Sequence, residues 1–138
     1  MGNSFAHIEL STDDTGKAQK FYKAIFPSWK FKAMPKMSYT LLDTGVKGAA
    51  GGGMQKLQMP EQPKAWLPYV EVADVKKTVD KARKAGAHVL QDYMEIGDMG
   101  AIAIFADPTG AAIGVWGAAP KKKAAPKKKA AKKSAKKR

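Results

Sequence analysis

The same succession of elements occurs twice along this chain of 138 residues, and that repetition limits the folds open to it. Two stretches alternate polar and apolar residues and then end in acids: HIELSTDD at 7–14 and YVEVAD at 69–74. Alternation with a period of two predicts a strand, and an aspartate directly after it predicts a helix N-cap. Each half of the chain is therefore expected to begin with a strand that leads into a helix.

A stripe of apolar residues at helical spacing follows each cap. The first stripe covers 18–26 and is ended by Pro27, which cannot continue the helical hydrogen bonds. The second covers 75–85 and is ended by Gly86, a favourable residue at a helix C-terminus. Both stripes predict amphipathic helices.

Three further strands are expected after each helix. The glycine-rich stretch 48–55 could be a loop, or a strand where backbone passes close to another group. It lacks the phosphate-binding pattern G-x-x-x-x-G-K-[ST] and no helix follows it, so we interpret it as a close-packed strand. The order is then strand, helix and three strands, twice, with the later strands at 29–34, 37–44, 48–55, 87–94, 100–106 and 111–116.

The first strand carries the residues that are most suited to bind a metal or to transfer a proton. His7 and Glu9 are two positions apart, so their side chains point to the same face of a strand. They could be half of a metal site, an acid/base pair, or two polar residues hydrogen-bonded to neighbours. The chain has no cysteine, which excludes disulfides, thiolate ligands and cysteine nucleophiles.

The positive charge is concentrated at one end. The formal net charge is +13, and residues 119–138 contain ten lysines, one arginine and no acid. Such a segment is expected to be disordered and to bind nucleic acid without sequence preference, by counterion release. The alternative is a tail that keeps the protein soluble and has no partner. Attachment to a membrane is not expected, because no apolar anchor accompanies the charges. The basic residues are Lys121, Lys122, Lys123, Lys127, Lys128, Lys129, Lys132, Lys133, Lys136, Lys137 and Arg138.

The motifs together resemble the vicinal oxygen chelate superfamily, which includes glyoxalase I, bleomycin resistance proteins and extradiol dioxygenases. The matching stretches include HIELSTDD, AQKFYKAIFPSWKF, GAAGGGM and GAIAIFADPTGAAIGVW, and the resemblance covers residues 3–118. It is greatest to small bacterial glyoxalase-like proteins. It implies an α+β domain at 1–118, in which two modules (about 3–56 and 65–118) form a curved mixed sheet around a cleft, with helices outside.

The resemblance also implies where metal ligands would lie. His7 matches the histidine position of the first module, and the second histidine position falls at Tyr69, or at Pro68 on another count. The glutamate position of the last strand falls at Gly114. The fourth strand of the first module offers only glycines, Met54 and Gln55. We therefore predict no cofactor, with a divalent metal held through His7 as the alternative.

The expected lining of the cleft follows from strand faces. Gly114 has no side chain and would leave room for a ligand, and the aromatic residues are typical of a ligand pocket. Packing in a homodimer interface is the alternative for Tyr69 and Trp116, and a homodimer is expected. His88 lies outside any ligand position. The predicted lining residues are His7, Glu9, Tyr69, Glu71, Gly114 and Trp116.

Three functions follow as hypotheses. The first is a metal-free protein that binds a small molecule and is held near nucleic acid by its tail. The second is a lyase, isomerase or dioxygenase in which His7 and Glu9 carry a metal or a proton. The third is a DNA-associated structural protein whose folded part only dimerises. A soluble cytoplasmic protein is expected, with association with the nucleoid if the tail binds DNA.

Overall fold

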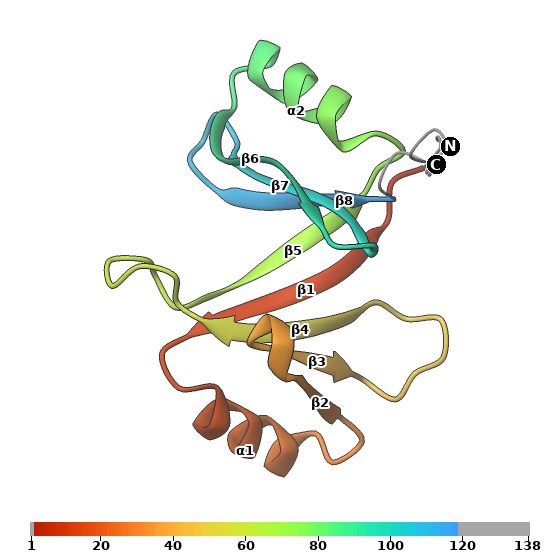
Figure 1. The fold of residues 1–138 in the computed structure, drawn as a ribbon, viewed down its shortest axis with the longest axis vertical. Helices are drawn as coiled ribbons and strands as arrows, with labels where there is room; N and C mark the ends of the chain where they lie inside the picture. Colours follow the sequence, from red (N-terminus) through yellow and green to blue (C-terminus); the bar gives the residue numbers. More distant parts are fainter. Residues whose placement is uncertain (1, 119–138) are drawn as a thin grey trace, which may run out of the picture.

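A computed structural model describes residues 2–118, so the predictions for the basic tail concern residues outside the described range. Within them, one sheet of eight strands is accompanied by two α-helices and a short 3₁₀ turn at Pro35–Met37 (Figure 1). The helices are α1 (Thr15–Ile25) and α2 (Val75–Lys84). The strands are β1 (Phe5–Thr12), β2 (Lys30–Met34), β3 (Tyr39–Asp43), β4 (Gly51–Lys56), β5 (Ala65–Glu71), β6 (His88–Ile96), β7 (Gly100–Ala106) and β8 (Ala112–Gly117).

The sheet is mixed, and its two halves repeat each other. The strand order is β2-β3-β4-β1-β5-β8-β7-β6. β1 pairs in parallel with β4, and β5 pairs in parallel with β8 in the same way. The halves meet where β1 and β5 run antiparallel across the middle of the sheet (Figure 1). The predicted α+β fold with a curved mixed sheet is confirmed, and the halves pair within one chain.

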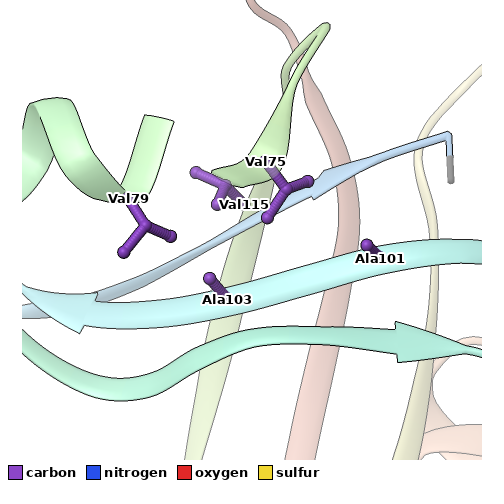
Figure 2. Packing of buried hydrophobic residues seen from close by; sticks show 5 residues of the cluster. All are labelled: Val75, Val79, Ala101, Ala103 and Val115. Atoms are coloured by element: carbon purple, nitrogen blue, oxygen red, sulfur yellow. The ribbon is translucent and has the colours of Figure 1, made fainter. Parts of the chain in front are cut away.

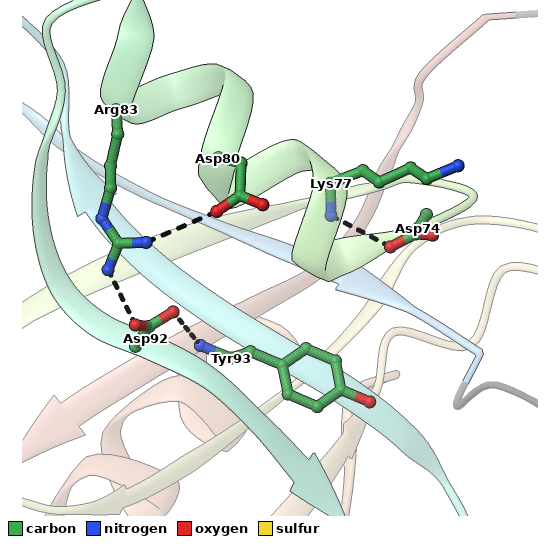
Figure 3. Close-up of polar contacts among 6 residues, drawn as sticks. All are labelled: Asp74, Lys77, Asp80, Arg83, Asp92 and Tyr93. Carbon is green, nitrogen blue, oxygen red and sulfur yellow. Dashed lines mark hydrogen bonds and ion pairs between the residues drawn. The ribbon is translucent and has the colours of Figure 1, made fainter.

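The predicted helix caps are present in both halves. The Asp14 carboxylate accepts a hydrogen bond from the Lys17 backbone N–H at 2.9 Å, and Asp74 accepts one from Lys77 at 3.0 Å (Figure 3). Each cap satisfies a backbone donor that the first helical turn leaves free. The same residue type at the same place in both halves supports the internal repeat seen in the sequence.

α2 covers the second half of the sheet. Its Val75 and Val79 pack on Ala101 and Ala103 of β7 and on Val115 of β8 (Figure 2). The two alanines have short side chains, so the helix lies close to the strands, and their exposed fraction is 0%.

The end of α2 is also tied to the edge of the sheet. Arg83 reaches Asp92 of β6 at 2.7 Å and Asp80 of its own helix at 3.5 Å (Figure 3). All three side chains are about half exposed, so these pairs contribute little to stability beside the apolar contacts.

α1 is amphipathic, as predicted, but its apolar stripe is only partly covered. Phe21 is 57% exposed and Ile25 is 49% exposed. Tyr22 contacts Trp66 of β5, with ring centroids 5.4 Å apart and a hydrogen bond from the indole to the hydroxyl at 3.2 Å. The helix therefore contacts the sheet mainly through the aromatic ring of Tyr22, near its middle.

Both helices lie on one face of the sheet. Val70 of β5 is paired with Val115, which α2 covers, and Trp66 shares the face of Val70 and contacts α1. The opposite face, here called the open face, carries neither helix. His7 and Glu9 of β1 belong to it, because Leu10 points to the helix side.

Within residues 2–118, no helix is long and apolar enough to cross a membrane.

Candidate functional site

Two tyrosine rings lie on glycines at the centre of the open face. Tyr39 projects from β3 over Gly53 of β4, where a Cβ atom would collide with the tyrosine ring and hydroxyl. Tyr69 projects from β5 over Gly114 of β8, where a Cβ atom would lie 2.5 Å from the ring carbons. The glycine strand is therefore close-packed as predicted, and what it accommodates is the Tyr39 ring.

These two rings, His7 and Gln55 form a group of four polar side chains around Glu9. One oxygen of Glu9 accepts hydrogen bonds from the Gln55 amide at 3.2 Å and from the Tyr69 hydroxyl at 3.3 Å. His7 Nε2 and the Tyr39 hydroxyl share a hydrogen bond 2.6 Å long. The Tyr39 hydroxyl also lies over Gly53, the residue that is paired with Glu9. We call this set the Glu9 cluster: His7, Glu9, Tyr39, Gln55 and Tyr69.

Burial favours the uncharged forms of the ionisable groups in the cluster. It raises the pKa of Glu9 above its ordinary value of 4.5, while hydrogen bonds from Tyr39 and Tyr69 act against that rise. Burial also lowers the pKa of His7 below 6.5. The pKa values of both tyrosines are raised well above 10, first by burial and then by the nearby Glu9 charge. At neutral pH the imidazole is neutral and both phenols are protonated donors.

Two interpretations of the predicted site are wrong. Gly114 does not leave room for a ligand, because the Tyr69 ring fills the space above it. Tyr69 is also not exposed for packing in a dimer interface, since only 3% of it is accessible within the single chain. Tyr69 is paired with His7 across β1 and β5. This agrees with the expectation that the two residues occupy equivalent positions in the two modules.

The other predicted residues lie farther from Glu9. Trp116 shares the open face with Gly114 but packs beside Gly100, and it is half-buried. Glu71 is exposed at the end of β5, where its backbone carbonyl accepts a hydrogen bond from Asn3 at 3.0 Å. His88 begins the edge strand β6 and is exposed, away from the cluster as expected.

Tyr39 was not predicted as a site residue, and Gln55 was considered only as a weak ligand position. A signal for Gln55 was available, because it follows Gly53 by two residues and so shares its face. Tyr39 is opposite Met34 in the β2–β3 pair, and its ring reaches Gly53 diagonally across β4. That contact depends on the register of β3 with β4, which local sequence does not determine.

The cluster does not fit a catalytic divalent metal. Such a centre usually has three protein ligands and an open position for water. Nowhere between residues 2 and 118 do three His, Cys, Asp or Glu side chains gather in a suitable group. The His7 Nε2 atom is bonded to Tyr39, and Tyr69 and Gly114 stand at two positions where the family has ligands.

Known proteins share the sequence pattern and the fold. Residues 4–45 match the family model described as bleomycin resistance protein-like N-terminal. CFP32 of Mycobacterium bovis, provisionally named a glyoxylase, is 33% identical over 114 residues, which are 79% of this chain and 43% of that protein. The chain belongs to the glyoxalase, bleomycin resistance protein and dioxygenase superfamily. The recognition made from the motifs is thus confirmed.

A second relative is the anthracycline biosynthesis protein DnrV of Streptomyces peucetius, at 25% identity over 126 residues, covering 80% of this chain and 46% of that protein. The chain thus spans less than half the length of the curated relatives it matches.

Solved structures agree on the fold. Methylmalonyl-CoA epimerase of Mycobacterium tuberculosis superimposes with a TM-score of 0.59 at 15% identity, covering 85% of this chain and 89% of that one. A superfamily member from Vibrio splendidus gives 0.58 at 12% identity, covering 84% and 99%. At these identities the likeness establishes the fold alone.

Proposed function

We propose that the open face binds a small molecule over the Glu9 cluster, without a catalytic metal. The observation that carries this proposal is a half-buried carboxylate whose hydrogen-bond partners, Gln55 and Tyr69, are both neutral. Among the described residues, no lysine or arginine forms an ion pair with Glu9. A carboxylate removed from water without a counter-charge costs stability, so its retention is better explained by binding than by packing.

The surroundings of Glu9 suggest the chemistry of the ligand. A cation or an N–H or O–H donor would supply the counter-charge that Glu9 lacks, whereas a ligand carboxylate would be repelled. An apolar wall adjoins the cluster on the same face, because Leu67 is paired with Glu9 and Ile104 with Gly114. Both side chains are half-buried and no helix covers them. We therefore expect a ligand with an apolar body and a donor or cationic head.

A matched pair of probes tests this function. Phenethylamine and 3-phenylpropionate share an aromatic body and carry opposite charges. At millimolar concentration the amine should raise the melting temperature of the full chain and the acid should not. Glu9→Gln should abolish the effect of the amine, and Glu95→Gln, on the exposed end of β6, should leave it intact. Stronger binding of the acid, or an unchanged response in Glu9→Gln, would show that the proposal is wrong.

Proton transfer is a second candidate function for the same cluster. A carboxylate whose pKa is raised by burial is suited to act as a general base, and the neutral His7 lies within reach through Tyr39. This supports a lyase or isomerase that works without metal. Turnover of a candidate substrate should fall at least a hundredfold in Glu9→Gln and persist in the presence of a chelator. Equal turnover in the variant would exclude this role.

For residues 119–138 we propose non-specific nucleic-acid binding. The support is the charge alone: ten lysines and Arg138 without an acid. If about six of these charges contact phosphates, the logarithm of affinity for duplex DNA should fall with the logarithm of salt with a slope near −5. The full chain and a chain ending at residue 118 should be compared by fluorescence anisotropy, with circular dichroism to verify the fold. Equal binding by the shortened chain would refute the proposal.

A further inference from the structure

Tyr39 is the member of the Glu9 cluster that strand periodicity did not predict. Tyr39 comes from β3, and its hydroxyl lies 2.6 Å from His7 Nε2. The same hydroxyl lies over Gly53, the residue that is paired with Glu9 of β1. The His7 and Tyr39 rings are nearly parallel, with centroids 6.2 Å apart. A single phenol thus occupies the space beside the imidazole, over the strand position paired with the carboxylate residue.

The position of this phenol is enforced by the backbone beneath it. Any side chain at residue 53 would collide with the Tyr39 ring and hydroxyl, so the ring can lie there only because Gly53 has no Cβ. Tyr69 is seated on Gly114 in the corresponding way in the second half. The cluster is therefore closed from both sides by aromatic rings placed on glycines, and the space near His7 Nε2 is occupied by protein.

We infer that Tyr39 takes the place of a metal ion in this site, because its hydroxyl is bonded to His7 Nε2 and keeps the imidazole from acting as a ligand. A metal would need His7 Nε2 at about 2.0–2.1 Å and a Glu9 oxygen at about 2.0–2.2 Å. The Tyr39 hydroxyl already lies beside Nε2 and over Gly53, the residue paired with Glu9. This inference rests on the proposed function, in which the site works without a metal, and it names Tyr39 as the side chain that excludes the metal.

The inference predicts that removing the ring uncovers a latent metal site. In Tyr39→Ala, His7 Nε2 would lose its hydrogen-bond partner. His7 and Glu9 would then share an open volume beside the Gln55 amide, whose oxygen can serve as a third ligand. Tyr39→Phe removes the hydroxyl and leaves the ring, so the volume stays filled. We expect metal affinity to increase in the alanine variant but not in the phenylalanine variant. That result would show that the ring excludes the metal by filling the site, and that loss of the hydroxyl alone does not admit it.

The experiment uses the untagged full chain, because a histidine tag would itself bind metal. Zinc and nickel are titrated by calorimetry into the wild type, Tyr39→Phe and Tyr39→Ala. We expect at least a tenfold higher affinity in Tyr39→Ala, lost again in Tyr39→Ala with His7→Ala. Tyr93→Ala is the matched control, since it removes a tyrosine that donates to Glu95 at 3.0 Å away from the cluster, and its affinity should equal that of the wild type.

Each result has a distinct meaning. A folded Tyr39→Ala variant without increased affinity, or with an increase that survives His7→Ala, overturns the role of Tyr39 and leaves the metal-free proposal standing. Stoichiometric zinc held by His7 in the wild type overturns both. If Tyr39→Ala does not fold, Gly53→Ala is used instead, because its methyl group expels the ring and should produce the same increase.

If neither variant folds, the imidazole ¹⁵N resonances of His7 in the wild-type full chain decide the question. They should not move in tenfold excess zinc. A shift would overturn the inference, because it would mean that the metal displaces Tyr39 from Nε2.

Discussion

Gly114→Ala offers a direct test of the way Tyr69 is held. The added methyl carbon would lie 2.5 Å from two ring carbons of Tyr69 and 3.0 Å from a third, well inside van der Waals contact. These atoms belong to the inner part of the ring, and Tyr69 is only 3% exposed, so the side chain cannot move aside without disturbing β5 or β8. The substitution therefore forces a displacement in the middle of the sheet.

The expected cost can be worked from two contributions. Overpacking of a filled site costs about 1–3 kcal/mol. Displacing the ring also breaks the hydrogen bond from Tyr69 to Glu9, which is long at 3.3 Å and contributes about 1 kcal/mol. The sum is about 2–4 kcal/mol of unfolding free energy. At about 4 °C per kcal/mol for a domain of this size, the melting temperature should fall by about 8–16 °C.

Urea and thermal unfolding of the full chain, followed by circular dichroism, measure this cost. Gly16→Ala is the control, because its methyl group would meet only the Asp14 carboxylate at an ordinary 3.6 Å and lies in helix α1. That variant should be unchanged or more stable by up to about 1 kcal/mol. If Gly114→Ala loses less than about 0.5 kcal/mol, which is the size of an ordinary surface effect, the Tyr69 ring does not lie on β8 as described.

Four other substitutions are informative. The pKa of Glu9 in the folded protein is raised above 4.5, so ionisation of Glu9 lowers the free energy of unfolding as the pH rises through and above that value. Glu9→Gln removes this loss. In urea titrations between about pH 4 and pH 7, the variant should therefore gain stability relative to the wild type. Asp14→Ala and Asp74→Ala should each lose about 1 kcal/mol of unfolding free energy, and similar losses are expected because the caps are alike. Met54→Ala should lose about 2–5 kcal/mol by calorimetry, because the side chain is fully buried; a loss below 1 kcal/mol would place it outside the core.

The fold could be predicted from the sequence because its signals are local and occur twice. The strand before Asp14 and the strand before Asp74 alternate clearly, and each aspartate caps the helix that follows. The apolar stripe of α1 correctly indicated a helix. It did not indicate how much of Phe21 and Ile25 would stay exposed, because burial depends on the distance between the helix and the sheet.

The site could be predicted only in part. His7, Glu9 and Tyr69 were identified because strand periodicity assigns each to a face, and the parallel and antiparallel pairing then brings them together. The prediction for Gly114 was wrong, because the space that a glycine leaves can be filled either by a ligand or by a neighbouring ring, and here the Tyr69 ring fills it. Tyr39 was missed because its contact with Gly53 joins two strands whose relative position is a tertiary property.

The pairing of β1 with β5 also brings the two ends of the described chain together. The Ser4 carbonyl accepts a hydrogen bond from the Glu71 N–H at 2.8 Å, and the Trp116 carbonyl accepts one from the adjacent Val72 N–H at 2.8 Å. Residues 4 and 116 thus lie beside consecutive residues at the end of β5, and Figure 1 shows the start of β1 close to the end of β8. A circular permutant that joins them and opens the loop between β4 and β5 would carry the halves in reverse order with every strand pair retained.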